Sequence, residues 1–383
     1  IRDSLSTARQ VAASLVPPPR DRAATNGPSA EARANAFGSD LRGMSEPQPM
    51  SRLISWALTD LMLEHREIVL AGEDVGRKGG VYGATQKLQA RFGPDRVIDT
   101  LLDEQSILGL GIGLAHNDLL PMPEIQFLAY LHNAEDQLRG EAATRSFFSD
   151  GQFTNPMVLR IAGLGYQRGF GGHFHNDNSL AVLRDIPGII LGCPSTGADA
   201  AMMLREAVRL AREEQRVVVI VEPIALYPMR DLLEPGDAAW MCRYPDPGEK
   251  LTFGKVGVYG DGKDISIVTS GNGHFLSRQA ANALASHGIE ARVIDMRWLN
   301  PQPDEALLEA TTACDAVLIV DECRRTGSQS EALMALFCEA GRKKLARVTA
   351  EDCFIATGPA YAATLPSAEG IVKAARKLVE QDG

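Results

Sequence analysis

The sequence of 383 residues lacks a block of basic residues and a long uninterrupted apolar run. Its formal net charge is −10 at pH 7, so nucleic acid and anionic membrane surfaces are poor candidate partners. No apolar run reaches the roughly 18 residues that a membrane-spanning helix needs, and the first residues lack the apolar core of a signal peptide. These absences predict a protein with no nucleic-acid partner and no membrane segment.

Cysteine is scarce, and no two cysteines stand in a C-x-x-C pair. Scattered cysteines are typical of reduced thiols in a cytosolic type of compartment, so we expect neither a disulfide framework nor a structural zinc site. The six are Cys193, Cys242, Cys314, Cys323, Cys338 and Cys353.

Residues 1–49 differ from the rest of the chain. Three consecutive prolines interrupt the segment, and apart from a possible short helix over 7–15 it shows no apolar periodicity, so we interpret it as an arm or linker. The chain opens with Ile1, whereas Met44 or Met50 would be a natural start for the folded part. This suggests the hypothesis that the chain is cut from a longer polypeptide, such as a fusion with a partner subunit. A native product whose measured mass begins at Met44 would contradict it.

The remainder of the sequence alternates between helical periodicity and short apolar strands. The composition, 45% hydrophobic and 23% charged, suits two or three globular domains. Strands separated by helical segments predict a mostly parallel sheet covered on both faces, and turn-forming residues over 243–248 predict a domain boundary. We therefore expect an α/β domain over 50–245 and a second, smaller α/β domain over 246–383.

The expected elements follow the apolar pattern of each segment. In the first domain, strands are expected at 67–72, 123–127, 157–160, 188–192 and 217–221, and helices at 51–64, 106–116 and 134–148. In the second domain, strands are expected at 255–259, 265–269, 291–295 and 316–320, and helices at 277–286 and 329–341.

Glu104, directly preceded by Asp103, stands between an apolar strand-like stretch and the Gly-rich helical stretch 109–115. An acid at the start of a helix can satisfy free backbone N–H groups and interact with the helix dipole. Alternatively, a carboxylate in an apolar, water-poor site can share a proton with a bound group. The local sequence leaves both interpretations open, with Leu102 and Ile107 as apolar neighbours.

Residues 123–127 read Pro-Glu-Ile-Gln-Phe, and Tyr130 follows three residues later. From the residues alone, Phe127 and Tyr130 are ordinary core aromatics. Further along, residues 171–175 read Gly-Gly-His-Phe-His. Loop histidines are often solvated, and a His-x-His metal site has no carboxylate or cysteine spacing in its favour here.

Two glycine patterns resemble cofactor-binding fingerprints without the structural context. The glycines of residues 109–113 have the wrong spacing for a dinucleotide fingerprint and are expected to allow close helix packing. Gly260-Asp261-Gly262 resembles the start of the magnesium-diphosphate motif of thiamine enzymes. It lies between two expected strands, so we interpret it as a hairpin turn.

Taken in order, the segments around Glu104, Tyr130 and His175 resemble the beta subunit of the thiamine-diphosphate-dependent decarboxylating component of 2-oxo acid dehydrogenase complexes. The branched-chain and pyruvate types are the most similar, and the resemblance covers roughly residues 50–375. It implies an α/β fold. A thiamine-diphosphate-binding domain of the pyrimidine type, with a parallel sheet, would occupy 50–245. A smaller domain similar to the C-terminal domain of transketolase would occupy 246–383.

The resemblance also implies roles for individual residues. Glu104 would hydrogen-bond N1′ of the aminopyrimidine, which favours the imino tautomer that takes the proton from the thiazolium C2. Leu102, Gln126 and Tyr130 would bind the cofactor pyrimidine, with the Tyr130 ring packed on it. His175 would handle protons, or steady developing charge, as the acyl group passes to lipoyl sulfur.

The sequence departs from the family pattern next to His175. Relatives usually read His-Ser-Gln, whereas this chain reads His175-Asn176-Asp177, and its loop 163–172 is longer and richer in glycine. His173 therefore competes with His175 for the active-site role.

The chain has no Gly-Asp-Gly motif followed at suitable spacing by asparagine. In the family that magnesium and diphosphate anchor belongs to the alpha subunit. The resemblance therefore implies a thiamine diphosphate site shared with an alpha subunit, Mg²⁺ held by the alpha subunit, and no activity of this chain alone. It also implies an assembly of two alpha and two beta subunits, a lipoyl acyltransferase core as partner, and a location in the bacterial cytoplasm or the mitochondrial matrix.

Other activities of the same architecture remain open. A transketolase-like or deoxyxylulose-phosphate-synthase-like enzyme would need basic and histidine residues for a sugar phosphate, and the stretch 124–137 fits the dehydrogenase type better. An acetoin-dehydrogenase-type subunit and a non-catalytic scaffold are further alternatives. Because Asn176 and Asp177 depart from the family pattern, the non-catalytic scaffold remains an alternative.

Overall fold

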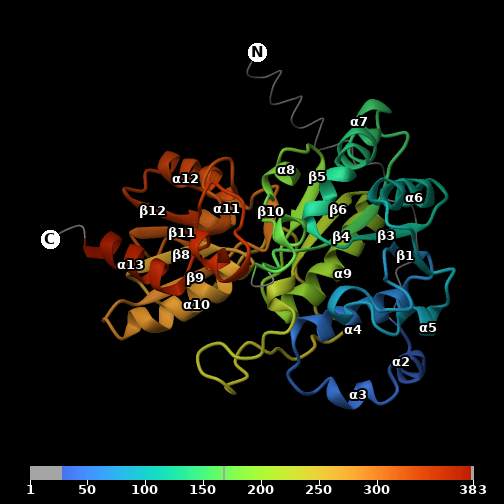
Figure 1. Ribbon diagram of the computed structural model, residues 1–383, viewed down its shortest axis with the longest axis horizontal. Helices are drawn as coiled ribbons and strands as arrows, with labels where there is room; N and C mark the ends of the chain where they lie inside the picture. Colours follow the sequence, from blue (N-terminus) through green and yellow to red (C-terminus); the bar gives the residue numbers. More distant parts are fainter. Residues whose placement is uncertain (1–27, 167–168, 381–383) are drawn as a thin grey trace.

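The computed structural model describes residues 28–166 and 169–380, and within this part of the chain two α/β units are each built on their own sheet (Figure 1). The first sheet has seven strands in the order β10-β5-β6-β4-β3-β1-β2, and the second has five in the order β12-β11-β8-β9-β7. Neighbouring strands of the first sheet are parallel except for β5 and β10. The expectation of two mostly parallel α/β units is confirmed.

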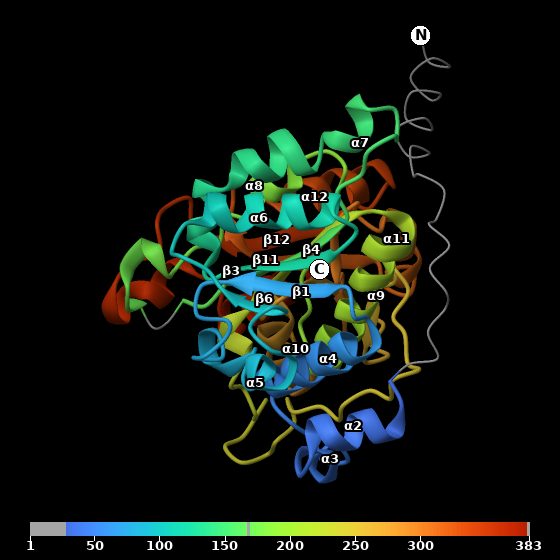
Figure 2. The ribbon, with the colours of Figure 1, turned by 90° about the vertical axis from the view of Figure 1, so that its right-hand side faces the viewer.

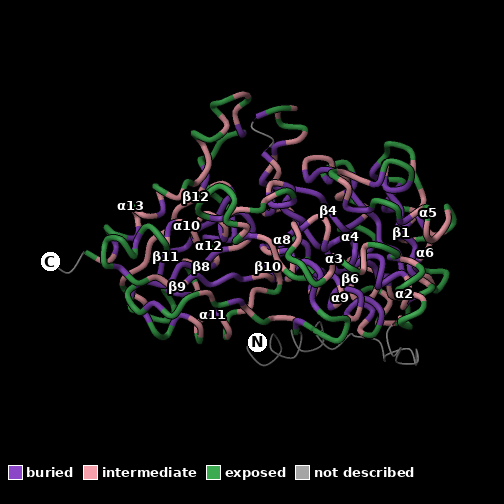
Figure 3. The backbone as a smooth tube through the Cα atoms, turned by 90° about the horizontal axis from the view of Figure 1, so that it is seen from below, coloured by how far each residue is buried: buried purple, intermediate pink, exposed green. Residues whose placement is uncertain are grey.

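The central strands of the first sheet are mostly apolar and are buried along their whole length. Such continuous burial is typical of parallel strands covered on both faces. Figure 3 shows buried residues running along the strands of both sheets. The bounds are β1 Ile68–Gly72, β2 Val97–Asp99, β3 Leu120–Ile125, β4 Met157–Gly163, β5 Ile189–Gly192, β6 Val217–Pro223 and β10 Trp298–Asn300.

Helices cover both faces of the first sheet (Figure 2). On one face α4 (Met50–Glu64) packs against α9 (Gly197–Glu214), and both contribute to one apolar cluster with the strands. On the other face α6 (Glu104–His116) contributes Ile107 and Leu108 to a second cluster. The shorter helical segments are α5 Leu88–Phe92, α7 Arg145–Phe148, α8 Ala181–Arg184, η1 Val81–Gly83, η2 Leu128–Asn133, the π-helix η3 Gln137–Ala142, η5 Gly172–Phe174 and η6 Ile224–Leu226.

The second sheet is also sandwiched between helices. Apolar residues of α10 (Asn272–Ala285) and α13 (Ala368–Val379) pack on one face, and those of α12 (Gln329–Glu339) pack on the other. The remaining bounds are β7 Gly257–Tyr259, β8 Ile265–Thr269, β9 Ala291–Asp295, β11 Ala316–Arg324, β12 Lys344–Ala350, α11 Asp304–Ala310 and η7 Gly358–Thr364.

The two units share part of their core. One apolar cluster contains buried residues of both sheets, including Leu191 of β5 and Ile319 of β11. Strand β10 lies in the second half of the sequence but pairs antiparallel with β5 of the first sheet. The predicted boundary near residue 245 stays a proposal, and the second half of the chain contributes to both sheets.

Two expectations about individual elements are wrong. Residues 260–262 do not form a hairpin turn, because β7 and β8 lie on opposite sides of β9 and do not pair with each other. The connection therefore crosses β9. The continuous helix expected over 134–148 is instead a π-helical segment followed by the short helix α7.

Part of the segment interpreted as an arm is structured. Residues 30–43 form α2 (Ala30–Phe37) and α3 (Asp40–Gly43). Phe37 is buried, and Arg33 forms an ion pair with Asp60 of α4 at 2.8 Å. The short helix considered over 7–15 lies outside the described residues.

Over the described residues, no helix is long and apolar enough to cross a membrane. All six cysteines are free thiols. In the same part of the chain, no group of three or more histidine, cysteine, aspartate or glutamate side chains could hold a metal ion.

Candidate active site

Glu104 is the first residue of α6 and is only 5% exposed. Its carboxylate Oε2 accepts a hydrogen bond from Asn133 Nδ2 at 3.4 Å. Within the described residues it accepts no backbone N–H, so it does not act as a helix cap. A buried carboxylate with one weak neutral donor is costly in a folded chain and is a typical sign of a binding or catalytic group.

A second carboxylate, Glu73, follows β1 directly and lies within electrostatic range of Glu104. Burial raises the pKa of Glu73, and the neighbouring Asp74 and Glu104 carboxylates raise it further. Burial also raises the pKa of Tyr130, and Glu73 and Glu104 add to that shift. These three side chains therefore share one region at the carboxyl end of the parallel strands, where α/β proteins commonly place their ligands.

His175 lies against two aromatic residues, Tyr130 and Phe127. Its Nε2 is 3.3 Å from the Tyr130 hydroxyl, and its ring centroid is 4.4 Å from that of Phe127. The Phe127 and Tyr130 rings meet edge to face with centroids 5.7 Å apart. His175 Nδ1 is buried and has no hydrogen-bond partner among the described residues. The imidazole thus has one nitrogen near Tyr130 and one without a partner.

Glycine is required in the turn before His175. Gly171 has φ +79°, and a Cβ built on it would lie 1.9 Å from His175 Nδ1. A side chain at this position would both strain the backbone and displace the imidazole. The Gly-rich composition of the loop therefore has a structural cause.

The structure brings some of the predicted site residues together and leaves others exposed to solvent. Glu104, Tyr130 and His175 occupy one region, and Gln126 is half-buried directly after β3. Leu102 is 70% exposed in the turn before α6. His173 is exposed, and its ring packs on Phe174 and faces Phe354 at 6.2 Å instead of Tyr130.

The sequence interpretation missed Glu73. The signal was present, because Glu73 is an acid placed directly after a buried apolar strand of a parallel sheet. Acidic turns after strands are common, however, and only the fold shows that this one lies within electrostatic range of Glu104.

A buried ion-pair network fixes the strand ends behind this region. Arg160 of β4 is 1% exposed and donates to both carboxylate oxygens of Glu222 at 2.7 Å and to Glu124. Glu124 and Arg160 are register partners on adjacent strands. Burial raises the pKa of Glu124, and the Arg160 guanidinium opposes that shift. The network holds the end of β3, from which Gln126 and Tyr130 extend.

We expect Arg160→Met to destabilise the fold strongly. The variant would leave the Glu124 and Glu222 carboxylates buried without a counter-charge, and breaking a buried ion pair on one side costs roughly 3–5 kcal/mol. Urea unfolding followed by circular dichroism measures the loss. The triple variant with Glu124→Gln and Glu222→Gln is the control and should recover most of it. An unchanged unfolding curve for Arg160→Met alone would contradict the assignment.

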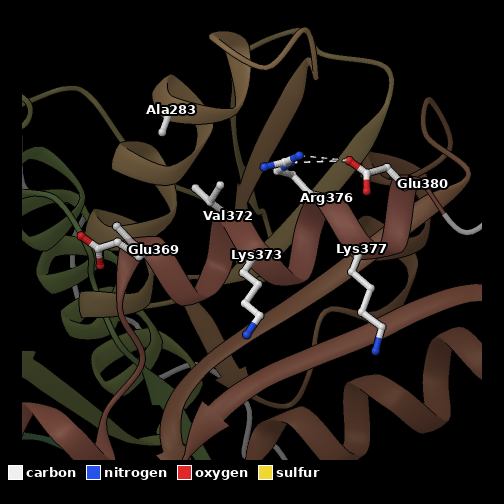
Figure 4. Close-up of a pocket in the computed structure, with 8 residues that line it drawn as sticks. Ala283, Glu369, Val372, Lys373, Arg376, Lys377 and Glu380 are labelled. Atoms are coloured by element: carbon white, nitrogen blue, oxygen red, sulfur yellow. Dashed lines mark hydrogen bonds and ion pairs between the residues drawn. The ribbon is translucent and has the colours of Figure 1, made fainter.

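A surface groove of about 670 Å³ follows α13 in the second unit, far from this region (Figure 4; Figure 1). Its charged lining includes Lys373 and Lys377, and Arg376 pairs with Glu380 at 3.5 Å. None of the predicted site residues lines it.

Comparison with known families covers most of the chain. The family model "Transketolase, pyrimidine binding domain" matches residues 46–229, and "Transketolase, C-terminal domain" matches residues 254–371. These matches confirm the two domain types that the resemblance implied.

Curated relatives are similar over most of their length. The pyruvate dehydrogenase E1 component subunit beta of Bacillus subtilis is 30% identical over 340 residues, which is 86% of this chain and 98% of the relative. The 2-oxoisovalerate dehydrogenase subunit beta of the same organism is 33% identical over 287 residues, 75% of this chain and 83% of the relative.

Solved structures show the same fold. A split-gene transketolase described as an inactive beta4 tetramer has a TM-score of 0.67 at 20% identity, over 87% of this chain and 99% of that chain. A transketolase mutant from Pichia stipitis has a TM-score of 0.60 at 17% identity, over 87% of this chain and 46% of that chain.

Proposed function

Because the chain belongs to the family of E1 beta subunits of 2-oxo acid dehydrogenases, we propose that it takes part in the oxidative decarboxylation of a 2-oxo acid. The substrate would be pyruvate or a branched-chain 2-oxo acid, and the acyl group would pass to a lipoyl group of an acyltransferase. The named relatives are of the pyruvate and 2-oxoisovalerate types, which supports this substrate class. The family is of the thiamine-diphosphate-dependent transketolase type, so thiamine diphosphate is the cofactor.

The observation that carries the proposal is the buried Glu104 carboxylate, which lacks a backbone donor and has Tyr130 and His175 in the same region. These residues fit one end of thiamine diphosphate. Glu104 would hydrogen-bond the aminopyrimidine, Tyr130 would pack on that ring, and Gln126 and Leu102 would lie beside it. When bound, the cofactor supplies a nucleophilic carbon that adds to the 2-oxo group and holds the negative charge released by decarboxylation.

The protein side chains around the cofactor control protons and water. Glu104 is shielded from solvent, so its carboxylate can share a proton with the ring it contacts instead of with water. We infer that His175, rather than His173, acts during acyl transfer, because only His175 lies against Tyr130 and Phe127. The imidazole would exchange a proton with the lipoyl sulfur or with the acyl oxygen through Nε2, the nitrogen that lies toward Tyr130.

Two features of the described residues support a partner subunit. The chain has no Gly-Asp-Gly motif followed at suitable spacing by asparagine, so we propose that an alpha subunit holds Mg²⁺ and the diphosphate. Leu101 and Leu102, which precede Glu104, are 84% and 70% exposed. An exposed apolar pair at the edge of a site is a surface that a partner commonly covers. We propose an assembly of two alpha and two beta chains that works with a lipoyl acyltransferase core.

Reconstitution tests the function. We expect this chain, co-purified with an alpha subunit that carries the magnesium-diphosphate motif, to decarboxylate pyruvate or 2-oxoisovalerate when thiamine diphosphate and Mg²⁺ are present. Either chain alone is the control and should be inactive, because each contributes half of the site. Release of CO₂ with an artificial electron acceptor measures the reaction. Activity on acetoin alone would identify an acetoin-dehydrogenase type, and turnover by this chain unaided would overturn the shared site.

A further inference from the structure

The segment from Leu164 to Asn178 carries both loop histidines, and its two ends bind the same residue of the second unit. Near one end, the Tyr166 hydroxyl donates to Glu322 Oε2. At the other end, Asn178 Nδ2 donates to the backbone oxygen of Glu322 at 2.8 Å. Glu322 belongs to β11, so one position in a strand of the second sheet holds both ends of a loop of the first unit.

Glu322 is itself held firmly. It is 4% exposed, and its carboxylate accepts from the Asn272 backbone N–H at 2.8 Å and from Asn272 Nδ2 at 2.6 Å. Asn272 Nδ2 also donates to the backbone oxygen of Leu164 at 3.0 Å, which ties the start of the loop to the same cluster. Burial raises the pKa of Glu322 to about 7, and hydrogen bonds from Tyr166 and Asn272 oppose the shift. The carboxyl group therefore depends on these donors for its place in the core.

The middle of the loop also rests on the second unit. Gly169 has φ +74°, and a Cβ built on it would lie 2.3 Å from the backbone nitrogen of Gly358. The His173 ring faces Phe354 at 6.2 Å, and Arg324 lies 4.0 Å from Asp177. The second unit thus contacts the loop on both sides of His175, while His175 itself faces Tyr130.

We propose that Tyr166 and Glu322 are positioning residues, which hold the loop so that the His175 imidazole stays against Tyr130. Their hydrogen bonds go to each other, to Asn178 and to Asn272, and they would act through His175. The inference rests on the proposed function, because it gives His175 a part in acyl transfer. It also assigns the second unit a task in the reaction, since β11 and α10 fix the loop of the first unit.

Tyr166→Phe tests the proposal, with Tyr244→Phe as the matched control. Both tyrosines are 8% exposed, and each donates to a buried carboxylate, but Tyr244 binds Asp60 in α4 and belongs to a different apolar cluster from Tyr166. In the assembled enzyme, Tyr166→Phe should lower kcat for lipoyl acylation roughly tenfold, because small misplacements of a catalytic group cost one to two orders of magnitude. KM for the 2-oxo acid should stay within about twofold, since the role proposed for the loop is in acyl transfer and not in substrate binding.

Hydrogen–deuterium exchange of residues 169–178 gives a readout that needs no turnover. The loss of one buried hydrogen bond should speed exchange there roughly fivefold to tenfold in Tyr166→Phe and leave it unchanged in Tyr244→Phe. Unchanged exchange in Tyr166→Phe, or equal effects of the two variants, would overturn the positioning role. If the wild-type assembly showed no decarboxylation, the proposed function would fail while the exchange result still decided how the loop is held.

Conservative replacement of Glu322 separates positioning from general stability. The amide oxygen of Glu322→Gln can accept from the Asn272 N–H, and its nitrogen can donate to the Tyr166 oxygen, but that nitrogen then meets the Asn272 Nδ2 donor. The variant keeps the contact with Tyr166, so kcat should fall by less than in Tyr166→Phe. Glu322→Ala removes both contacts and should match or exceed the loss in Tyr166→Phe. If the alanine variant does not fold, Glu322→Gln decides alone, because its amide keeps the contact with Tyr166 while Tyr166→Phe removes it. A larger loss of kcat in Glu322→Gln than in Tyr166→Phe would contradict the proposal.

Discussion

Replacing Glu104 with glutamine is expected to abolish decarboxylation while leaving the assembly intact. Glutamine keeps the size of the side chain and its hydrogen-bonding oxygen but cannot take up or release a proton at the aminopyrimidine. Loss of a positioned acid–base group typically costs 10²–10⁴-fold, so we expect kcat to fall by roughly that factor. The variant subunit should still bind its alpha partner, because the substitution removes no packing volume. CO₂ release from the reconstituted enzyme measures the effect.

A control for this variant is another buried glutamate outside the site. Glu206 of α9 has the same exposure as Glu104, 5%, and is paired with Arg209 at 2.8 Å. Glu206→Gln should therefore change stability but leave kcat within about threefold of wild type, as is usual for substitutions away from the chemistry. Calorimetric titration with thiamine diphosphate shows whether Glu104→Gln still binds the cofactor. Normal turnover of Glu104→Gln would refute the assignment of this carboxylate.

The strands were the most predictable part of the fold, because buried parallel strands are short apolar runs. The runs at 157–160 and 217–221 fall within β4 and β6, and the helix expected at 51–64 begins one residue earlier, at Met50. Strand β10 could not be found in this way. It has three residues and lies in the sheet of the other unit, so only its pairing with β5 defines it as a strand. The same reason explains the mistaken hairpin, since local turn chemistry does not show that β9 lies between β7 and β8.

Site residues that belong to a local sequence motif could be predicted. Site residues that are far apart in the sequence and meet only in the fold could not. Glu104 and His175 lie in recognisable segments, and the structure places both near Tyr130. Their roles stay predictions until the variants are measured. Tyr166 and Glu322 are 156 residues apart in the sequence, and neither has a local signal for its hydrogen bond. A core tyrosine and a strand glutamate become a functional pair only because two domains meet at that point.

Replacing His175 with alanine is expected to separate the two halves of the reaction. If the imidazole acts during acyl transfer, the transfer to lipoyl should fall roughly 10²–10⁴-fold, as for loss of a general acid or base. Decarboxylation measured with an artificial electron acceptor should fall by less than about tenfold, because in the proposed function Glu104 and the cofactor carry that step. Both rates are measured on one preparation of the reconstituted enzyme. The ratio of the two rates then reports the role independently of how much active enzyme is present.

His173→Ala is the matched control for this variant, because His173 is two residues away in the same loop but faces Phe354. It should leave the ratio of acyl transfer to decarboxylation near that of wild type. A selective loss of acyl transfer in His173→Ala would transfer the role to that residue. Equal losses of both rates in His175→Ala would instead mean that His175 acts before decarboxylation, for example in holding the 2-oxo acid. His175 lies against Phe127 and Tyr130, while His173 is exposed. The geometry therefore favours an unchanged ratio in His173→Ala and a selective loss of acyl transfer in His175→Ala.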